Sequence, residues 1–327
     1  MRGLFNPFGL IRTRRTVRAR PVRAKPVEQR PRDGLSTIAS FGGNPGALRM
    51  KLFLPPGLQL GRPIIVVLHG CGQSAVTFAA DAGWVALANH YKVALVLPEQ
   101  TSSNNHGRCF NWFLRDDIRP KGGEAASIRQ MVLKAAKLLQ SDRKRIFVTG
   151  FSAGGGMAAA LIAAYPAMFA AAAVFAGMPV GSASTAIGAL LHMRNANTFR
   201  SRGMLAADVL QVTGAVARKR WPRVSIWHGE EDHTVHPANA EVLAAQWSAL
   251  HGLAAEPSSD ETTSGVRRRF WGRVGQMPAV ELCTLSNIGH GFPIDRRNGR
   301  GGRAGAWVTD AGVSGPDCAA AFFRLRR

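Results

Sequence analysis

The stretch R-I-F-V-T-G-F-S-A-G-G-G-M, residues 145–157, decides the fold of this chain. Residues 146–149 are apolar or β-branched and predict a short buried strand. The next five residues fit G-x-S-x-G, and an alanine-rich segment of helical character follows at once. Strand, tight turn and helix in this order are the context of a nucleophile elbow, in which a serine hydroxyl is exposed at the edge of a parallel sheet. Ser152 is therefore the candidate nucleophile.

Further apolar runs predict a sheet around this elbow. A strand that is apolar along its whole length is typical of a parallel sheet covered on both faces. Helical spacing lies between the runs, over residues 127–139 before the elbow strand and over 318–325 near the C-terminus. The alternation predicts an α/β fold with a mainly parallel, doubly wound sheet and helices on both faces. The predicted strands cover residues 49–54, 64–68, 93–97, 171–175, 224–227 and 280–285.

The chain of 327 residues is long enough for one large domain with a substantial core. Residues 46–327 are assigned to that domain, and residues 1–45 to a basic, proline-containing tail that we expect to be disordered. Residues 177–222 break the strand–helix rhythm and predict a small cap or lid insertion. Residues 296–305 form a low-complexity arginine–glycine loop.

The formal net charge is +22, because 42 Lys and Arg residues outnumber 20 Asp and Glu residues. Such an excess attracts polyanions. We attribute the excess of positive charge to a compositional bias together with the basic tail. Because no signature of a nucleic-acid-binding fold occurs, we expect no specific nucleic-acid partner. Binding of polyanions by the tail stays open. No apolar run reaches about eighteen residues, so the sequence predicts no transmembrane segment.

A serine needs a base to remove its proton, and histidine is the usual base because its pKa lies near neutral pH. In proteins with a nucleophile elbow the acid and the histidine follow late strands, in that order along the chain. Asp232 follows the predicted strand 224–227, and His290 follows the strand 280–285. Ligands bind at this carboxyl edge of a parallel sheet. Ser152, Asp232 and His290 are therefore the candidate catalytic residues.

Neighbouring residues offer alternatives to this choice. Glu231 is a rival acid, and Asp310 is a weaker one. Three histidines near Asp232 raise the question of a metal site, but no further carboxylate or cysteine is placed to complete it. We therefore expect no metal. The three histidines are His228, His233 and His236.

Acyl transfer also needs N–H groups directed at the oxyanion of the tetrahedral intermediate. The backbone N–H of Ala153, at the start of the helix after the nucleophile, should supply one. The loop H-G-C after the strand 64–68 should supply the other, and we assign it to Cys71. His69 in this loop is expected to have a structural role.

Several motifs occur together with the elbow: L-H-G-C-G-Q (68–73), L-P-E-Q (97–100), C-F-N-W-F (109–113), G-G-E-A-A-S-I (122–128), G-F-S-A-G-G-G-M-A-A-A-L (150–161) and A-Y-P-A-M-F-A-A (164–171). With the later H-G and G-H-G segments, this set resembles the polyhydroxybutyrate (PHB) depolymerase-like esterases, a family that includes feruloyl and acetylxylan esterases. The resemblance extends over residues 52–327.

The resemblance implies an α/β-hydrolase fold and a serine carboxylesterase without a cofactor. It also implies Ser152, Asp232 and His290 as the triad, and the amides of Cys71 and Ala153 as the oxyanion hole. A disulfide between Cys71 and Cys109 is implied as well, because relatives bridge the corresponding cysteines. A pairing of the other two cysteines, Cys283 and Cys318, has no motif behind it and stays open.

The chain departs from the family pattern beyond the histidine. Relatives often carry W-P-G there, whereas this chain has Phe292-Pro293 and then the arginine–glycine loop. We expect Trp307 to supply an aromatic wall, and we assign Trp112, Phe292 and Trp307 to substrate binding. Many relatives are secreted, but no continuous apolar stretch of a signal peptide follows the N-terminal charges. Extracellular and cytoplasmic locations both stay open.

The function predicted from the sequence is hydrolysis of hydroxyalkanoate polymer or oligomer esters through a Ser-His-Asp acyl-enzyme mechanism. One alternative keeps this chemistry and changes the substrate to feruloyl or acetyl esters of plant polysaccharide. A second alternative is a polyanion-binding or granule-surface protein that uses the hydrolase fold as a scaffold. The basic tail and the arginine–glycine loop motivate this last hypothesis.

Overall fold

The computed structural model describes residues 34–213, 220–298 and 302–326. Within them, ten strands form one sheet in the order β1-β2-β4-β3-β5-β6-β7-β10-β9-β8, and β11 pairs separately with β12. The six strands from β4 to β10 in that order run parallel, and an antiparallel pair flanks them at each edge. The strands are β1 (Leu35–Ile38), β2 (Arg49–Phe53), β3 (Ile64–Leu68), β4 (Ala94–Glu99), β5 (Ile146–Phe151), β6 (Ala171–Phe175), β7 (Arg223–Gly229), β8 (Ser259–Thr263), β9 (Val266–Trp271), β10 (Val280–Leu285), β11 (Phe292–Ile294) and β12 (Val308–Asp310).

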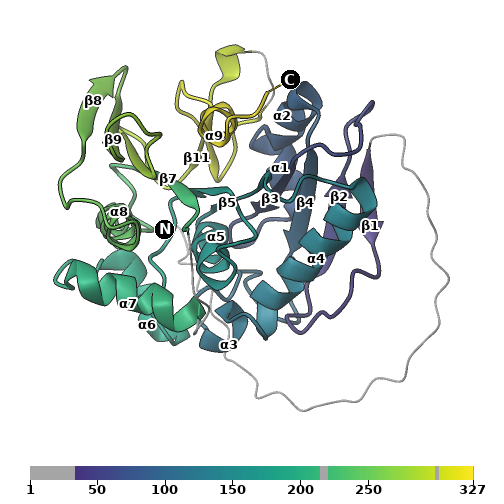
Figure 1. The fold of residues 1–327 in the computed structure, drawn as a ribbon, viewed down its shortest axis with the longest axis horizontal. Helices are drawn as coiled ribbons and strands as arrows, with labels where there is room; N and C mark the ends of the chain where they lie inside the picture. The colour runs from purple at the N-terminus through teal and green to yellow at the C-terminus, as the bar shows by residue number, and fades with distance from the viewer. Residues whose placement is uncertain (1–33, 214–219, 299–301, 327) are drawn as a thin grey trace, which may run out of the picture.

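Helices cover both faces of this sheet, so the predicted doubly wound α/β arrangement is confirmed (Figure 1). One core lies between the sheet and the layer of α3 to α8, and the other lies between the sheet and α1, α2 and α9. The helices are α1 (Ala75–Asp81), α2 (Trp84–Tyr91), α3 (Arg115–Ile118), α4 (Gly123–Leu139), α5 (Ala153–Ala164), α6 (Ala186–Arg194), α7 (Arg202–Thr213), α8 (Ala238–Leu250) and α9 (Gly315–Phe323), with a short 3-10 turn at Arg296–Asn298.

Helix α5 lies at the centre of its layer, and every one of its twelve residues is buried. Alanine and glycine make this possible, because small side chains let the helix approach the sheet and its neighbours closely. At Gly156 a Cβ atom would lie 2.8 Å from the Trp112 ring. The tight packing fixes the start of α5, and with it the position of Ser152.

The structure corrects several predicted boundaries. Strand β1 pairs with β2 inside the range assigned to the tail, so the folded domain includes residues from at least Gly34 onward. The rest of the predicted tail, residues 1–33, lies outside the described residues. Helix α4 begins at Gly123 and α9 at Gly315, both earlier than predicted. The β8–β9 hairpin was not predicted, because its exposed strand S-D-E-T-T has no apolar pattern.

The segment assigned to a cap, residues 177–222, contains α6 and α7, and its residues 214–219 lie outside the described ones. Helix α7 packs against α5 and α8 as part of the helical layer. Gln246 of α8 donates to the carbonyls of Val180 and Leu205 within this segment. The end of α6 contacts the loop after Asp232, where the His236 N–H donates to Met193 O at 2.7 Å. That residues 177–222 act as a cap or lid stays a prediction. None of the described helices is both long and apolar enough to span a bilayer.

Candidate active site

Ser152 sits between β5 and α5 with φ 56° and ψ −120°, a backbone conformation that is strained for a residue with a side chain. Its N–H donates to Phe175 O of the neighbouring strand at 2.9 Å, which holds the turn. The flanking glycines are required by close approach. A Cβ atom at Gly150 would lie 2.1 Å from Gly154 O, and one at Gly154 would lie 2.4 Å from Leu68 O. The sequence G-F-S-A-G thus folds as a sharp elbow.

The three predicted catalytic side chains lie in hydrogen-bond contact. Ser152 Oγ is 3.0 Å from His290 Nε2, and His290 Nδ1 is 2.6 Å from Asp232 Oδ2. They come from three loops at the carboxyl ends of β5, β7 and β10, the edge of the sheet that the sequence predicts. His290 also packs against the ring of Phe151, with the two centroids 5.0 Å apart. This contact orients the imidazole between the serine and the carboxylate.

Asp232 is almost fully buried, and the surrounding groups stabilise its ionised form. Burial raises the pKa of its carboxyl, but the hydrogen bonds from His228 and His290 outweigh burial and bring the pKa well below its usual range. Oδ1 accepts from the N–H groups of Thr234 and Val235 at 2.9 and 2.8 Å. Asp232 is therefore a fixed carboxylate that can accept the Nδ1–H of His290.

His228 is the residue near Asp232 whose contact the sequence did not anticipate. Its Nε2 lies 3.2 Å from Asp232 Oδ2 and 2.8 Å from Val235 O. His228 thus contacts the same carboxylate oxygen, Oδ2, as His290 does.

The rival acids lie elsewhere. Glu231 is exposed, and Asp310 accepts from the Arg296 N–H at 3.3 Å. His233 and His236 are also exposed. The geometry therefore favours Asp232 over both alternatives as the partner of His290.

Two backbone N–H groups near Ser152 are candidates for binding an anion. Ala153 is the first residue of α5, where a helix leaves its N–H groups without intrahelical partners. Cys71 lies in the turn after β3, which packs against the elbow through Gly70 and Phe151. Neither N–H donates to another residue within the described parts of the chain. This arrangement favours the predicted pair of oxyanion donors.

The Cys71 turn is held by a covalent link. Cys71 and Cys109 form a disulfide in the structure, the pairing that the family resemblance implies. The Gly72 N–H donates to Gly107 O at 2.9 Å across the same two loops. Cys283 and Cys318 are free thiols, so the open possibility that they pair is wrong. Cys318 instead contacts the Arg268 guanidinium, with Nη2 3.7 Å from Sγ.

Reduction of the disulfide is expected to destabilise the protein and lower its activity together. The two cysteines are separated by 38 positions in the sequence. Because a bridge over a loop of this length restricts the unfolded chain, breaking it should destabilise the folded state by about 4 kcal/mol. Loss of the link also frees the Cys71 amide. Urea denaturation and hydrolysis of p-nitrophenyl butyrate, each with and without dithiothreitol, measure both effects, and a Cys71→Ser/Cys109→Ser variant should match the reduced protein. Equal stability and activity in both redox states would contradict a role for the bridge.

Buried polar side chains form hydrogen bonds with both of the loops that the disulfide joins. His69 donates from Nδ1 to Gly70 O at 2.7 Å and accepts at Nε2 from the Gln100 N–H at 3.1 Å. The Gln100 amide donates to Cys109 O at 3.0 Å and to Glu124 Oε1 at 2.6 Å. Glu124 has no exposed surface and also accepts from the Asn111 N–H at 2.9 Å. The network joins the turn of Cys71 to the segment of Cys109.

Glu124 was not singled out from the sequence, although G-G-E opens helix α4. Burial raises the pKa of its carboxyl well above the usual range and the nearby Asp117 raises it further, whereas its hydrogen bonds act in the opposite direction. A carboxyl group is expensive to bury unless it is hydrogen-bonded. The signal in the sequence was a glutamate within an otherwise small and apolar helix start.

The buried His69 should make the folded state less stable at acidic pH. Burial lowers the pKa of His69 to about 4, from 6.5 in the unfolded chain. As the pH falls from 6.5 to 4 the unfolded chain takes up the proton first, so the folded state loses about 3 kcal/mol over this window. Urea denaturation of wild type and His69→Gln at pH 7 and pH 4 tests this. The variant should lose less stability on acidification, and an identical loss in both proteins would contradict the assignment.

Of the three aromatic residues assigned to substrate binding, Trp307 alone is well exposed, at 44%. Its ring lies edge-on to His290, with the centroids 5.9 Å apart. Phe292 has no exposed surface, since it fills the core under the site among Phe78, Phe151 and Phe175. The assignment of Phe292 to substrate contact is therefore corrected, and Trp112 is likewise a core residue, 5% exposed beneath α5.

Comparison with known proteins places this geometry in a family. The sequence profile of the family described as Esterase PHB depolymerase matches residues 48–268, more than half of the chain. The chain belongs to this family. A poly(3-hydroxyalkanoate) depolymerase C from Paucimonas lemoignei is 38% identical over 288 residues, which cover 85% of this chain and 67% of that protein. Membership makes the chain a carboxylic-ester hydrolase, as predicted.

Other similar proteins carry the names of esterases with different substrates. A feruloyl esterase B from Talaromyces stipitatus is 29% identical over 269 residues, covering 80% of this chain and 73% of that protein. The solved structure of an acetyl xylan esterase from Aspergillus awamori superimposes with a TM-score of 0.76 at 22% identity, covering 89% of this chain and 99% of that one. This structural similarity confirms the α/β-hydrolase fold.

Proposed function

We propose that this family member hydrolyses hydroxyalkanoate esters through an acyl-enzyme on Ser152. The observation that carries the mechanism is the continuous contact from Ser152 Oγ through His290 to the buried Asp232. The choice of substrate rests on the 38% identity to a poly(3-hydroxyalkanoate) depolymerase over most of the chain.

In the proposed reaction, Ser152 Oγ attacks the ester carbonyl while His290 Nε2 takes the hydroxyl proton. Asp232 accepts the Nδ1–H of His290, which keeps Nε2 available as the acceptor and stabilises the imidazolium that forms. His290 then returns the proton to the leaving alcohol. Water, deprotonated by the same Nε2, releases the carboxylic acid and restores Ser152.

The negative charge on the carbonyl oxygen is stabilised by the N–H groups of Ala153 and Cys71. Such donors act in the transition state because their positions are fixed before the reaction. The disulfide and the His69–Gln100–Glu124 network hold the Cys71 donor in place.

The substrate is proposed to lie along a cavity of about 390 Å³ between the Cys71 turn and Trp307. Gly72, Phe78 and Trp307 are among the residues that line it. Asp81 and Arg303, 3.1 Å apart, close one part of its wall. The Trp307 ring beside His290 is an apolar surface that suits the aliphatic units of a hydroxyalkanoate, and polar side chains, among them Gln73, Thr77 and Arg108, line other parts of the cavity.

The rival substrates are feruloyl and acetyl esters, and relatives with those names motivate them. Purified protein should be offered a hydroxybutyrate trimer, methyl ferulate and acetylated xylan at equal ester concentration, with Ser152→Ala as the blank. We expect the highest kcat/KM for the hydroxybutyrate trimer. Faster release of ferulate or acetate would overturn the substrate and leave the serine mechanism standing.

The chain belongs to a family of carboxylic-ester hydrolases. We therefore abandon the hypothesis of a binding protein that uses the hydrolase fold only as a scaffold. Of the two segments that motivated it, residues 1–33 of the basic tail and residues 299–301 of the arginine–glycine loop lie outside the described residues.

A further inference from the structure

The arginine–glycine loop separates Trp307 from His290 in the sequence, yet the structure brings the two rings together. Their centroids lie 5.9 Å apart. After the loop, the backbone of Trp307 is held at the site by Phe292, whose N–H donates to Trp307 O at 2.9 Å. This bond does not involve the turn before Trp307, residues 302–306. The position of that turn therefore depends on other contacts.

Asp81 and Arg303 hold the turn through backbone and side chain together. The Arg303 N–H donates to Asp81 O at 2.7 Å, while Arg303 Nε and Nη2 donate to Asp81 Oδ1 and Oδ2 at 3.1 and 3.4 Å. We call this set of contacts the Asp81–Arg303 clasp. Within the described parts of the chain, the other hydrogen bonds of residues 302–306 join Gly305 to Val308, inside the same segment.

The local sequence on both sides suits the clasp. Asp81 is the last residue of α1, where the negative end of the helix dipole disfavours a carboxylate. The Arg303 guanidinium offsets this repulsion, because its planar fork fits the two carboxylate oxygens. Gly302 allows the close approach at φ 104°, since a Cβ atom there would lie 3.3 Å from Asp81 O and from the Ile294 side chain.

The clasp also joins two segments that line the cavity of about 390 Å³ next to Trp307. Most of the lining comes from these segments, one within residues 72–81 and the other within residues 303–308. Asp81 lies on the first segment, and Arg303 lies on the second together with Trp307. Because the clasp links the two segments, it limits how far they can separate.

We propose that Asp81 and Arg303 are positioning residues, which hold the turn before Trp307 against α1 and keep the Trp307 ring in place for contact with the ester substrate. This inference rests on the proposed function, in which Trp307 contacts the substrate. The Arg303 side chain is 80% exposed, and an ion pair of such exposure contributes little to global stability. Loss of the clasp therefore acts on the position of Trp307 and on substrate binding, while the triad keeps its own contacts.

The first test observes Trp307 directly and needs no substrate. The chain has seven tryptophans, so labelling with fluorotryptophan followed by fluorine NMR gives one resonance for each, and Trp307→Phe identifies that of Trp307. Arg303→Gln removes the guanidinium and keeps the backbone N–H. We expect this variant to shift the Trp307 resonance and to leave the others in place. An unchanged Trp307 resonance would overturn the proposal.

The second test is a double-mutant cycle on the kinetics of p-nitrophenyl butyrate hydrolysis. We expect Arg303→Gln and Asp81→Asn each to raise KM by about threefold, an effect of the size of one exposed ion pair, and to change kcat by less than about twofold. In the Trp307→Ala background the same Arg303→Gln change should alter KM by less than about 1.5-fold, because the ring that the clasp positions is absent. Effects on KM that multiply in the double variant would overturn the proposal.

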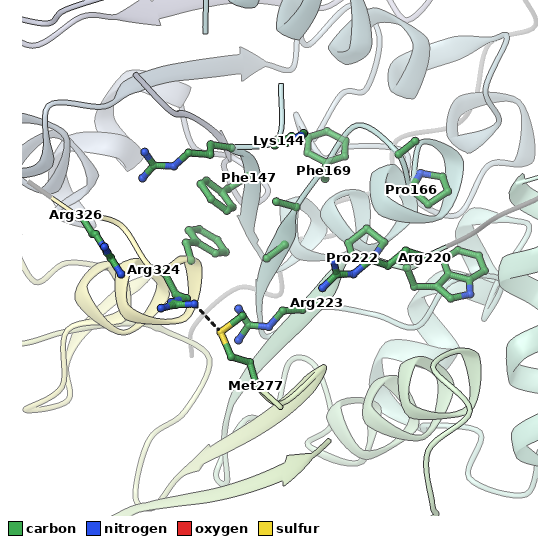
Figure 2. Close-up of a pocket in the computed structure, with 16 residues that line it drawn as sticks. Lys144, Phe147, Pro166, Phe169, Arg220, Pro222, Arg223, Met277, Arg324 and Arg326 are labelled. Carbon is green, nitrogen blue, oxygen red and sulfur yellow. Dashed lines mark hydrogen bonds between the residues drawn. The ribbon is translucent and has the colours of Figure 1, made fainter. Parts of the chain in front are cut away.

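Two other arginines serve as matched controls. Arg297 belongs to the same loop but pairs with Asp295, at 3.0 Å. Arg326 lines a different cavity, of about 680 Å³, at the amino ends of β5, β6 and β7 and thus at the sheet edge away from Ser152 (Figure 2). Arg297→Gln and Arg326→Gln should leave KM and the Trp307 resonance as in wild type. An equal rise of KM in either control would show a general effect of charge and overturn the proposal.

Failure of the proposed function would give a different result from failure of the clasp. A wild-type chain that does not hydrolyse p-nitrophenyl butyrate would contradict the proposed serine esterase. The NMR comparison of wild type with Arg303→Gln would still decide whether the clasp positions Trp307.

Discussion

Ser152→Ala is expected to lower kcat for p-nitrophenyl butyrate by about 10,000-fold or more. The alanine leaves no oxygen to form the acyl-enzyme, and His290 then has no hydroxyl to deprotonate. The fold should be unaffected, because the hydroxyl makes one described contact, to His290, and alanine tolerates the turn at φ 56° no worse than serine. Steady-state kinetics and a thermal melt measure the two effects.

The matched control for this variant is Ser286→Ala. Ser286 is exposed after β10, where it donates to Glu230 at 3.0 Å and takes no part in the proposed chemistry. Its loss should change kcat by less than about twofold. Turnover in Ser152→Ala close to that of Ser286→Ala would show that the nucleophile lies elsewhere.

Asp232→Asn is expected to lower kcat by about 10,000-fold while leaving substrate binding nearly unchanged. Oδ1 accepts two backbone N–H groups, so an asparagine would keep its carbonyl oxygen there and turn its NH₂ toward His290. His290 would then have to accept at Nδ1 and carry its proton on Nε2, where it cannot receive the proton of Ser152. Comparison of kcat and KM at pH 7 separates this loss from weaker binding.

The control is Glu231→Gln, which removes the neighbouring rival acid with the same loss of charge. Glu231 is exposed and should affect kcat by less than about twofold. A large loss in Glu231→Gln combined with a small one in Asp232→Asn would reverse the assignment of the acid.

The elbow and the parallel strands were predictable because they rest on local patterns. A buried parallel strand must be apolar along its whole length, as in Ile64–Leu68, and the close approach of Gly150 and Gly154 to their neighbours leaves room only for glycine. Since ligand-binding loops follow the carboxyl ends of such strands, Asp232 and His290 could be chosen from their positions alone.

Other features depend on partners that are distant in the sequence. The exposed β8 strand is stabilised by pairing with β9 and by the contact of Asp260 with Arg267, so its own residues carry no strand pattern. Burial of Glu124 depends on donors from Gln100 and Asn111 in other loops. For Phe292 and Trp112, the residue type alone does not distinguish an aromatic wall from a core side chain.

The central claim is that Ser152 carries the acyl group. The direct test is to treat the wild type with a serine-directed fluorophosphonate, follow the loss of esterase activity, and map the adduct by peptide mass spectrometry. We predict one adduct per chain, on Ser152, with activity lost in proportion to labelling and no adduct in Ser152→Ala. Full activity after complete labelling of Ser152, or an adduct on another residue that tracks inactivation, would contradict the account.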